Sequence, residues 1–183
     1  MRIIAGAFKG RTLRGPTGPG VRPTSDSLRE TLFNIIRDRV EGARFLDGFA
    51  GTGAVGLEAL SRGASEATFV ERDARVMSLL EKNVAACRVE NRVTVLKDLF
   101  AGVARRRGLV GEFDIVFVDP PYDIEGINGI IAEAASCITP AGLLIVEHGR
   151  KRTVEPVVGA VERYRLLEAG DSALSFYSVP SAG

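Results

Sequence analysis

Hydrophobic residues along the chain fall into two kinds of segment, and their alternation predicts the fold. Short apolar runs typical of buried strands are separated by segments in which apolar residues recur with the period of a helix. Strands joined through helices form a mostly parallel sheet. The predicted strands lie at 44–49, 66–72, 92–98, 112–119 and 142–148, and the predicted helices at 54–63, 73–87, 99–108 and 124–138.

The N-terminal end departs from this pattern. Residues 2–15 alternate weakly around a central glycine and predict a short hairpin. Residues 15–27 are irregular, because glycine and proline interrupt both helices and strands. Residues 27–40 predict a helix that begins with a capping box of Ser27 and Glu30.

The C-terminal end has two predicted strands with no helix between them. Residues 164–170 and 173–179 flank a tight turn at Asp171-Ser172, so one late strand must run antiparallel. We therefore expect an α/β fold whose mostly parallel, seven-stranded sheet is closed by an antiparallel hairpin. We expect residues 1–24 to form an extension and residues 25–183 to form the main domain.

Composition narrows the class of protein. The 183 residues suffice for one domain, and 45% hydrophobic and 26% charged residues are ordinary for a soluble chain. No apolar run approaches the ~18 residues that cross a bilayer. The first residues lack the pattern of a signal peptide, so we expect a cytoplasmic protein without membrane partners. Cys87, Cys137 and the single histidine, His148, form no metal-ligand pattern, so we expect no metal and interpret all three as buried structural residues.

Charge is distributed unevenly, although the net charge is only +1. Residues 1–29 hold six basic residues and one acidic residue (+5), and the remainder holds 18 basic and 22 acidic residues (−4). A basic arm on a nearly neutral body favours a polyanionic partner, although a solubilising tail would have the same composition. We interpret a second basic run, Arg105-Arg106-Arg107, as a solvated helix end.

The loop after the first strand of the alternating region favours a cofactor site. Gly51, Gly53 and Gly56 match GxGxxG, where glycines let the backbone approach a ligand. Dinucleotide-binding proteins share this match. However, Asp47 precedes the loop, and the sign of the Coulomb interaction favours an amine-bearing ligand over a pyrophosphate. S-adenosylmethionine carries a sulfonium and an ammonium group, and we expect it to be the cofactor.

Two further acids follow predicted strands. Glu71 ends the second strand, where a carboxylate can accept both ribose hydroxyls. Asp98 ends the third, where it could accept from an adenine amino group or cap the next helix. The two roles of Asp98 are compatible, and the sequence leaves both open.

The fourth strand ends in Asp119-Pro120-Pro121-Tyr122, which predicts a rigid site for a planar amine. The prolines stiffen the backbone, and the Asp119 carboxylate and the following carbonyl are acceptors. Two acceptors on an exocyclic amino group would localise its lone pair and aim it at an incoming methyl. Tyr122 can stack on the base, which must be unpaired or flipped out of a helix.

The chain resembles a known family from residue 2 to about residue 179. "DPPY" with "DGFAGTG" upstream is similar to amino-methyltransferases that use S-adenosylmethionine. "RIIAGAFKGRTL", "RPTSDSLRETLFNII", "FVERD", "FVDPPY" and "VEH" look like the bacterial RsmD family, which makes N2-methylguanine in small-subunit (16S) ribosomal RNA. The resemblance implies a Rossmann-like class I methyltransferase that transfers a methyl group to N2 of a guanine in 16S ribosomal RNA, within the small subunit.

The resemblance also implies a role for each matching residue, and we expect the protein to act as a monomer. The Asp119 to Tyr122 stretch would be catalytic and hold the guanine. The cofactor would contact Asp47, Phe49, Ala50, Gly51, Thr52, Gly53, Glu71, Arg72, Asp98 and Leu99. The RNA would contact Arg2, Lys9, Arg11, Arg14, Arg22, Thr24 and Arg29.

Three other functions would share parts of this sequence pattern. DPPY also occurs in adenine-N6 DNA methyltransferases, but these generally need further target-recognition sequence. An inactive RNA-binding protein of the same fold would not need the intact Asp119 to Tyr122 stretch. A dehydrogenase would share only the glycine pattern.

Overall fold

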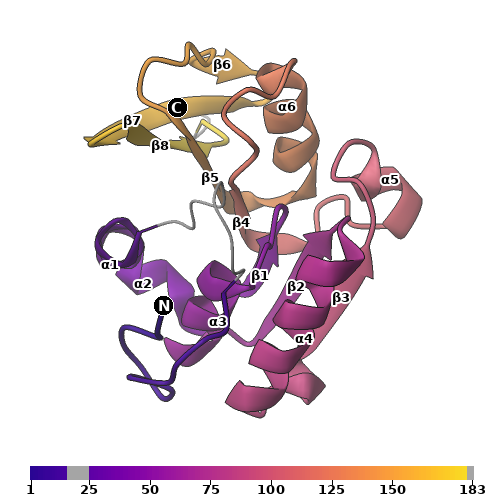
Figure 1. The fold of residues 1–183 in the computed structure, drawn as a ribbon. Coiled ribbons are helices and arrows are strands. Elements are labelled where there is room, and N and C mark those ends of the chain that lie inside the picture. Colours follow the sequence, from indigo (N-terminus) through magenta and orange to yellow (C-terminus); the bar gives the residue numbers. More distant parts are fainter. Residues whose placement is uncertain (16–24, 181–183) are drawn as a thin grey trace. The chain divides into compact units, whose positions relative to one another are not determined.

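The predicted alternation of strands and helices is present, distributed over two compact units, Met1–Asp98 and Leu99–Gly183. The structure, a computed structural model, describes residues 1–15 and 25–180 (Figure 1). The predicted domain boundary after residue 24 lies beside residues that are not described, and it stays a prediction.

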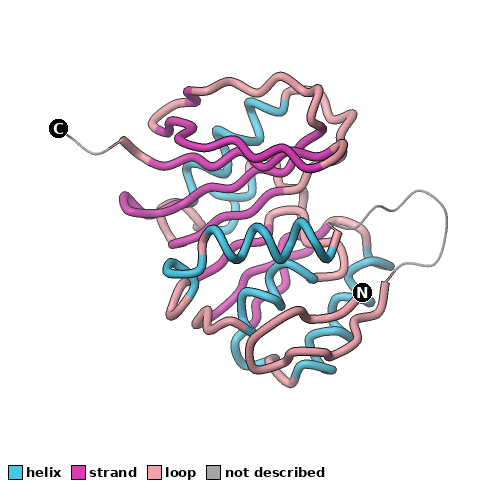
Figure 2. The backbone as a smooth tube through the Cα atoms, turned by 90° about the vertical axis from the view of Figure 1, so that its left-hand side faces the viewer, coloured by secondary structure: helices cyan, strands magenta, loops and turns pink. Residues whose placement is uncertain are grey.

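In the first unit, three parallel strands are joined by helices. The strands lie in the order β3-β2-β1, and Figure 2 traces them in magenta. The first helix of this region, α3, packs against β1 and β2, and α4 packs against β2 and β3. Because the strands are parallel, their carboxyl ends share one edge of the unit. The elements are β1 (Arg44–Asp47), α3 (Ala54–Ser61), β2 (Glu66–Glu71), α4 (Ala74–Cys87), the 3₁₀ turn η1 (Glu90–Arg92) and β3 (Val93–Lys97).

The predicted N-terminal helix is two helices, α1 (Asp26–Ile35) and α2 (Arg37–Val40). The predicted capping box is wrong, because Ser25 rather than Ser27 is the N-cap. Its Oγ accepts a hydrogen bond from the amide of Leu28 at 3.1 Å, which satisfies one free donor of the first turn.

Residues 1–15, called the arm below, form a reduced version of the predicted hairpin. One antiparallel bridge joins Arg2 to Thr12, and the amide of Ile3 donates to the carbonyl of Arg11 at 3.0 Å. Ile3 and Leu13 are buried. The amide of Ala7 also donates to the carbonyl of Ser61 in α3 at 2.7 Å, so apolar side chains as well as hydrogen bonds hold the arm to the rest of the first unit.

The second unit contains five strands, in the order β4-β5-β8-β7-β6. β4 and β5 are parallel, whereas the pairs β5–β8, β8–β7 and β7–β6 are antiparallel. The hairpin of β7 and β8 turns at Gly170-Asp171, as predicted to within one residue. The elements are α5 (Val103–Arg107), β4 (Phe113–Val118), α6 (Ile127–Cys137), β5 (Ile138–Gly149), β6 (Val157–Val158), β7 (Val161–Ala169) and β8 (Ser172–Ser178).

Two details of the second unit correct the sequence-based prediction. The described residues hold eight strands rather than seven, because the two-residue strand β6 is too short to show a periodic pattern. Ile138 begins β5 instead of ending α6, which stops at Cys137. The parallel α/β arrangement closed by an antiparallel hairpin is confirmed.

Aromatic side chains fill the core of each unit. Phe33 of α1 stacks on Phe45 of β1 with ring centroids 6.4 Å apart. Gly56 lets α3 approach β2, since a Cβ there would stand 2.3 Å from the ring of Phe69. Burying each such ring contributes roughly 1.5–3 kcal/mol. Within residues 1–15 and 25–180, no helix has the length and hydrophobicity that a membrane span requires.

Candidate active site

Asp47, the last residue of β1, is an almost completely buried carboxyl group with 1% of its surface exposed. Its Oδ2 accepts from the amide of Gly56 at 3.2 Å, and its buried Oδ1 has no hydrogen-bond partner among the described residues. Burial raises the pKa of Asp47 to about 7; the nearby Glu71 carboxylate adds to this, while the amides of Gly56 and Phe49 oppose it.

Glu71, at the end of β2, is fixed by two backbone amides. Its Oε2 accepts from Gly51 at 3.0 Å and its Oε1 accepts from Asp73 at 2.8 Å. Each carboxylate oxygen retains a second lone pair, so these bonds orient Glu71 without exhausting its capacity as an acceptor. Gly53 has φ +80° and forms the N-cap of α3, a conformation that glycine adopts readily.

Asp98 follows β3, and its amide donates to the carbonyl of Glu71 at 3.2 Å. The alternative role of Asp98 as a helix cap is wrong, because α5 begins later and has Gly102 as its N-cap. Arg72 is exposed, and so is Leu99, the first residue of the second unit, with 55% of its surface accessible.

The first-unit residues predicted to bind the cofactor thus converge on one edge. This edge fits a ligand that carries an amine and a ribose. The buried Oδ1 of Asp47 lacks a donor among the described residues, and no atom there lies within 4 Å of where a side chain of Gly51 would begin. A carboxylate supplies the charge that an ammonium group needs, and Glu71 supplies oriented acceptors for hydroxyl groups.

Asn83 of α4 connects this edge to the arm, a role that no pattern in the sequence indicated. Its side chain is completely buried. Its Oδ1 accepts from the amide of Arg14 at 2.7 Å, and its Nδ2 donates to the carbonyls of Arg14 and Thr52, both at 2.9 Å. Asn83 therefore bonds to the arm and to the glycine loop at the same time.

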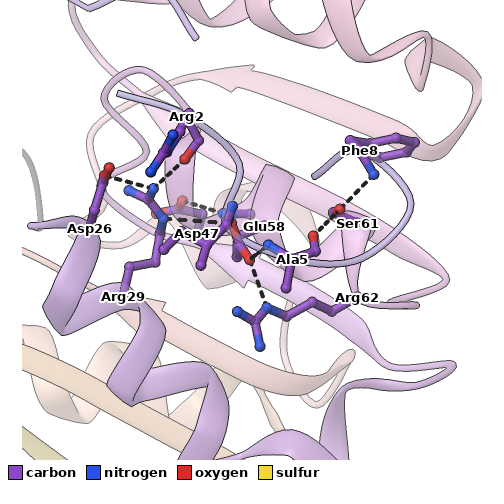
Figure 3. A network of polar contacts seen from close by, with 11 residues as sticks. Arg2, Ala5, Phe8, Asp26, Arg29, Asp47, Glu58, Ser61 and Arg62 are labelled. Atoms are coloured by element: carbon purple, nitrogen blue, oxygen red, sulfur yellow. Dashed lines mark hydrogen bonds and ion pairs between the residues drawn. The ribbon is translucent and has the colours of Figure 1, made fainter. Parts of the chain in front are cut away.

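Glu58 of α3 holds the other end of the arm (Figure 3). Its carboxylate is fully buried and accepts from the amides of Ile4 at 2.8 Å and Ala5 at 3.0 Å. Arg62 donates to it at 2.7 Å. One signal in the sequence pointed to this residue, since Glu58 is the only charged residue in the apolar stretch AVGLEALS.

The burial of Arg29 contradicts its predicted contact with RNA. Its side chain is fully buried, and its Nη2 donates to the carbonyl of Arg2 at 2.6 Å and to Asp26 at 2.9 Å (Figure 3). Its Nε lies 3.8 Å from the Glu58 carboxylate. A guanidinium buried in this way cannot reach a phosphate, and it instead neutralises a buried acid.

The remaining basic residues of the arm differ in their surroundings. Arg2, Lys9 and Arg14 are exposed. Arg11 is half-buried, donates to the carbonyl of Ala86 and lies over the ring of Phe8, 5.8 Å from its centroid. The predicted contacts Arg22 and Thr24 lie outside the described residues.

Asp119 and the two prolines follow β4 directly, as predicted. Asp119 is half-buried, Pro120 is buried and Pro121 is exposed. The carbonyl of Pro121 accepts from the amide of Ile124 at 2.9 Å, which closes a turn around Tyr122. The segment is therefore a turn that presents an acid and an aromatic ring.

Tyr122 is anchored by its hydroxyl group while 39% of its surface stays exposed. The hydroxyl lies 2.5 Å from Oγ of Ser172 and donates to Oε1 of Glu147 at 3.4 Å. Gly149 lies against the ring, since a Cβ there would stand 3.5 Å from Cδ2 of Tyr122. The ring is consequently held in place as a partly exposed platform.

Arg152 also fixes this loop, and no local sequence pattern indicated this. Its Nη1 donates to the carbonyl of Tyr122 at 3.5 Å, and its Nη2 donates to the carbonyl of Ile124. Arg152 therefore has a positioning role for the DPPY loop.

The predicted structural role of His148 is confirmed. Its two ring nitrogens lie 3.0 Å from the carbonyl of Gly149 and 2.8 Å from Oγ of Ser175. Burial, assisted by the charge of Arg163, lowers the pKa of His148, against the backbone hydrogen bond with Gly149. Cys87 and Cys137 are free and buried.

Known proteins resemble this chain over nearly its full length. Residues 1–178 match the model of a family described as conserved hypothetical protein 95. The ribosomal RNA small subunit methyltransferase D of Escherichia coli K12 is 41% identical over 189 residues, which cover 100% of this chain and 92% of that protein. The protein of the same name in Haemophilus influenzae is 39% identical over 67% of this chain and 64% of its own length.

Solved structures agree with this likeness. A hypothetical protein from Thermus thermophilus superposes with a TM-score of 0.81 at 31% identity, covering 98% of this chain and 99% of that one. The Thermus thermophilus 16S rRNA N2 methyltransferase RsmC, solved with AdoMet and guanosine, has a TM-score of 0.71 at 24% identity, covering 90% of this chain and 45% of that one. The latter likeness shows the fold alone, and it confirms the Rossmann-like methyltransferase fold.

Proposed function

Since this chain belongs to the RsmD family of ribosomal RNA methyltransferases, described as conserved hypothetical protein 95, we propose that it methylates N2 of one guanine in small-subunit ribosomal RNA. The methyl donor in this proposal is S-adenosylmethionine. The E. coli relative, which carries the small-subunit methyltransferase name, aligns with all of this chain. This alignment makes ribosomal RNA a stronger candidate than DNA.

The observation that carries the proposal is the anchored DPPY loop. Asp119 follows β4 at the end of the strand, and Tyr122 is held by Ser172 while its ring stays partly exposed. An aromatic platform beside a carboxylate suits a planar base with an exocyclic amine, and stacking on such a ring contributes about 1–3 kcal/mol. An inactive RNA-binding protein would have no need of this combination.

The chemistry assigned to the loop is the orientation of a weak nucleophile. The lone pair of the guanine N2 amino group is delocalised into the ring. The Asp119 carboxylate and the Pro120 carbonyl would accept hydrogen bonds from its two N–H groups, so that the lone pair is directed out of the ring plane. Methylation would make the nitrogen cationic, and the Asp119 carboxylate would stabilise this charge until the proton is lost to solvent.

Cofactor binding is assigned to residues of the first unit. S-adenosylmethionine would supply an electrophilic methyl group on a sulfonium centre. Asp47 would hold its ammonium group, Glu71 its ribose hydroxyls and Asp98 its adenine amino group. The orientation of Glu71 by Gly51 and Asp73 supports this assignment, because acceptors that are fixed in advance lose little entropy on binding.

Transfer of tritium from labelled S-adenosylmethionine tests the proposal. Bacterial small subunits lacking the modification, free ribosomal RNA and duplex DNA are offered separately, and we expect label in N2-methylguanine of the small subunit. Asp119→Ala should abolish transfer while cofactor affinity, measured by calorimetry, stays within about twofold, since Asp119 is assigned to the base. Asp123→Ala, an exposed acid in the same loop, is the matched control.

Each alternative has its own outcome. Label only in N6-methyladenine of DNA would establish the adenine-N6 activity. Tight cofactor binding without label in any substrate would support an inactive binder. Equal loss of transfer and cofactor affinity in Asp119→Ala would show that Asp119 has been assigned to the wrong ligand. The monomeric state stays a prediction, which light scattering of the purified protein would check.

A further inference from the structure

A basic pocket lies beside Tyr122, and the proposed methyl transfer makes no use of its residues Arg150 and Lys151. It has a volume of about 420 Å³ and lies within the second unit. Tyr122 and Gly149 line it, and its charged lining is Arg150, Lys151, Arg152 and Asp171, a formal charge of +2. The pocket therefore combines an aromatic ring with an excess of positive charge.

The backbone that carries the basic side chains is fixed. The amide of Arg150 donates to the carbonyl of Asp171 at 2.8 Å, and the amide of Arg152 donates to the carbonyl of Gly149 at 2.8 Å. The first bond ties the segment after β5 to the turn between β7 and β8, and the second closes a turn at the end of β5. The cations are thus presented from a defined turn.

The three cations are not equivalent. Arg152 is engaged with the carbonyls of Tyr122 and Ile124 in the DPPY loop. Arg150 and Lys151 are exposed, and their side chains make no hydrogen bond or ion pair with any residue in the described part of the chain. Both side chains can therefore bind an external anion without giving up an internal contact.

We propose that Arg150 and Lys151 bind the phosphate backbone of the RNA strand that carries the target base. The proposal rests on the proposed function, because it takes Tyr122 as the residue on which that base stacks. Tyr122 lines the pocket. If the target base stacks on its ring, the phosphates of that nucleotide and of the next one along the strand would lie near the pocket. Arginine and lysine are the side chains that bind phosphate, and an unpaired strand exposes its backbone to them.

The variant that tests the proposal is Arg150→Gln combined with Lys151→Gln. Arg152 is left intact because it holds the DPPY loop. The control is Arg37→Gln combined with Arg105→Gln, which removes the same charge from exposed positions outside the pocket. Binding of a single-stranded RNA containing the target sequence is measured from about 50 to 200 mM salt, along with binding of inorganic phosphate and methyl transfer to small subunits.

We expect the pocket variant to bind RNA about tenfold more weakly than the control variant. Its plot of log affinity against log salt should be shallower by about 1.4, since each single-stranded phosphate that is no longer neutralised removes about 0.7. KM for small subunits should rise by a similar factor with kcat little changed, because the interaction forms equally in the ground and transition states.

Other results would overturn the proposal. An unchanged salt slope and KM in an active enzyme would remove the pocket from the RNA interface while leaving the proposed function intact. Weaker binding of inorganic phosphate with unchanged RNA affinity would assign the pocket to a free anion. If the wild type transfers no methyl group, the proposed function fails, and the RNA-binding comparison alone decides whether the pocket binds RNA.

Discussion

At the scale of a single side chain, Asp47, to which we assign the ammonium group of the cofactor, opposes the stability of the fold. Burial raises its pKa from 3.8 in an exposed carboxyl group to about 7 in the fold. Between these two values the folded protein binds more protons than the unfolded chain does, so stability falls as pH rises through this window. At pH 8 the cost of the buried charge is on the order of 4 kcal/mol.

The first prediction therefore concerns Asp47→Asn, which keeps an acceptor for Gly56 but removes the charge. The variant should unfold at a higher denaturant concentration than the wild type at pH 8, and the difference should shrink towards pH 5. Its affinity for S-adenosylmethionine should fall at least about tenfold, because an ammonium group loses its counter-ion. Denaturation at both pH values and calorimetry check this, and a variant less stable at pH 8 would contradict the assigned pKa.

Two substitutions of Tyr122 separate the contribution of its ring from that of its hydroxyl group. Tyr122→Ala removes the stacking platform, and we expect kcat/KM to fall by about 10- to 100-fold, the equivalent of about 1–3 kcal/mol. Tyr122→Phe loses only the bonds to Ser172 and Glu147 and should stay within about fivefold of the wild type. Equal damage from both changes, in steady-state kinetics on small subunits, would assign the function to the hydroxyl.

At the scale of elements, α3 and α4 do more than cover strands. Glu58 and Ser61 of α3 bind one part of the arm, and Asn83 of α4 binds its far end and the glycine loop. The arm and the glycine loop are therefore bound to the same pair of helices. A substitution that displaces the arm should also change the glycine loop.

Asn83→Ala tests this connection. It leaves the carbonyls of Arg14 and Thr52 without the donor that Asn83 supplies, and we expect the free energy of unfolding to fall by about 2–3 kcal/mol. Hydrogen exchange at the Arg14 amide should become faster, and cofactor affinity should also fall. Asn91→Ala, which changes an exposed asparagine in η1, is the control and should stay within about 0.5 kcal/mol. A matching small loss in both variants would show that the arm is held by its apolar contacts alone.

The same elements show what sequence can predict. β1 to β4 and α4 were predicted to within two residues because continuous apolar runs and helical periodicity are local patterns. The N-cap at Ser25 was missed because Ser27 offers the same local signal. The partners of Asn83 and Arg152 could not be predicted, since each polar group binds backbone far away in the chain. Neither could the burial of Arg29, because a basic residue in a helix usually faces solvent.

At the scale of the whole molecule, the proposals above assign two sets of exposed basic residues to RNA. One is the exposed part of the arm, Arg2, Lys9 and Arg14, as the sequence predicted. The other is the pair Arg150 and Lys151, which a count of N-terminal charge overlooked. A long polyanion such as ribosomal RNA carries enough phosphates to offer a partner to each set.

Substitutions in the arm allow a separate prediction about RNA affinity. Lys9→Gln combined with Arg14→Gln should weaken binding to small subunits and lower the salt slope, by about 0.7 to 0.9 for each phosphate that is no longer neutralised. Thermal unfolding should be unchanged, because Asn83 binds only the backbone of Arg14. Filter binding at several salt concentrations checks the first part. An unaltered slope would leave the arm with a purely structural role.

The manner in which the arm is attached has a consequence for how such proteins diverge. Helices α3 and α4 hold it largely through backbone groups, the amides of Ile4, Ala5, Phe8 and Arg14 among them. Almost any amino acid offers the same amide at those positions. The exposed side chains of the arm can therefore be exchanged during evolution or design without loss of its attachment, provided that Glu58, Ser61 and Asn83 are kept.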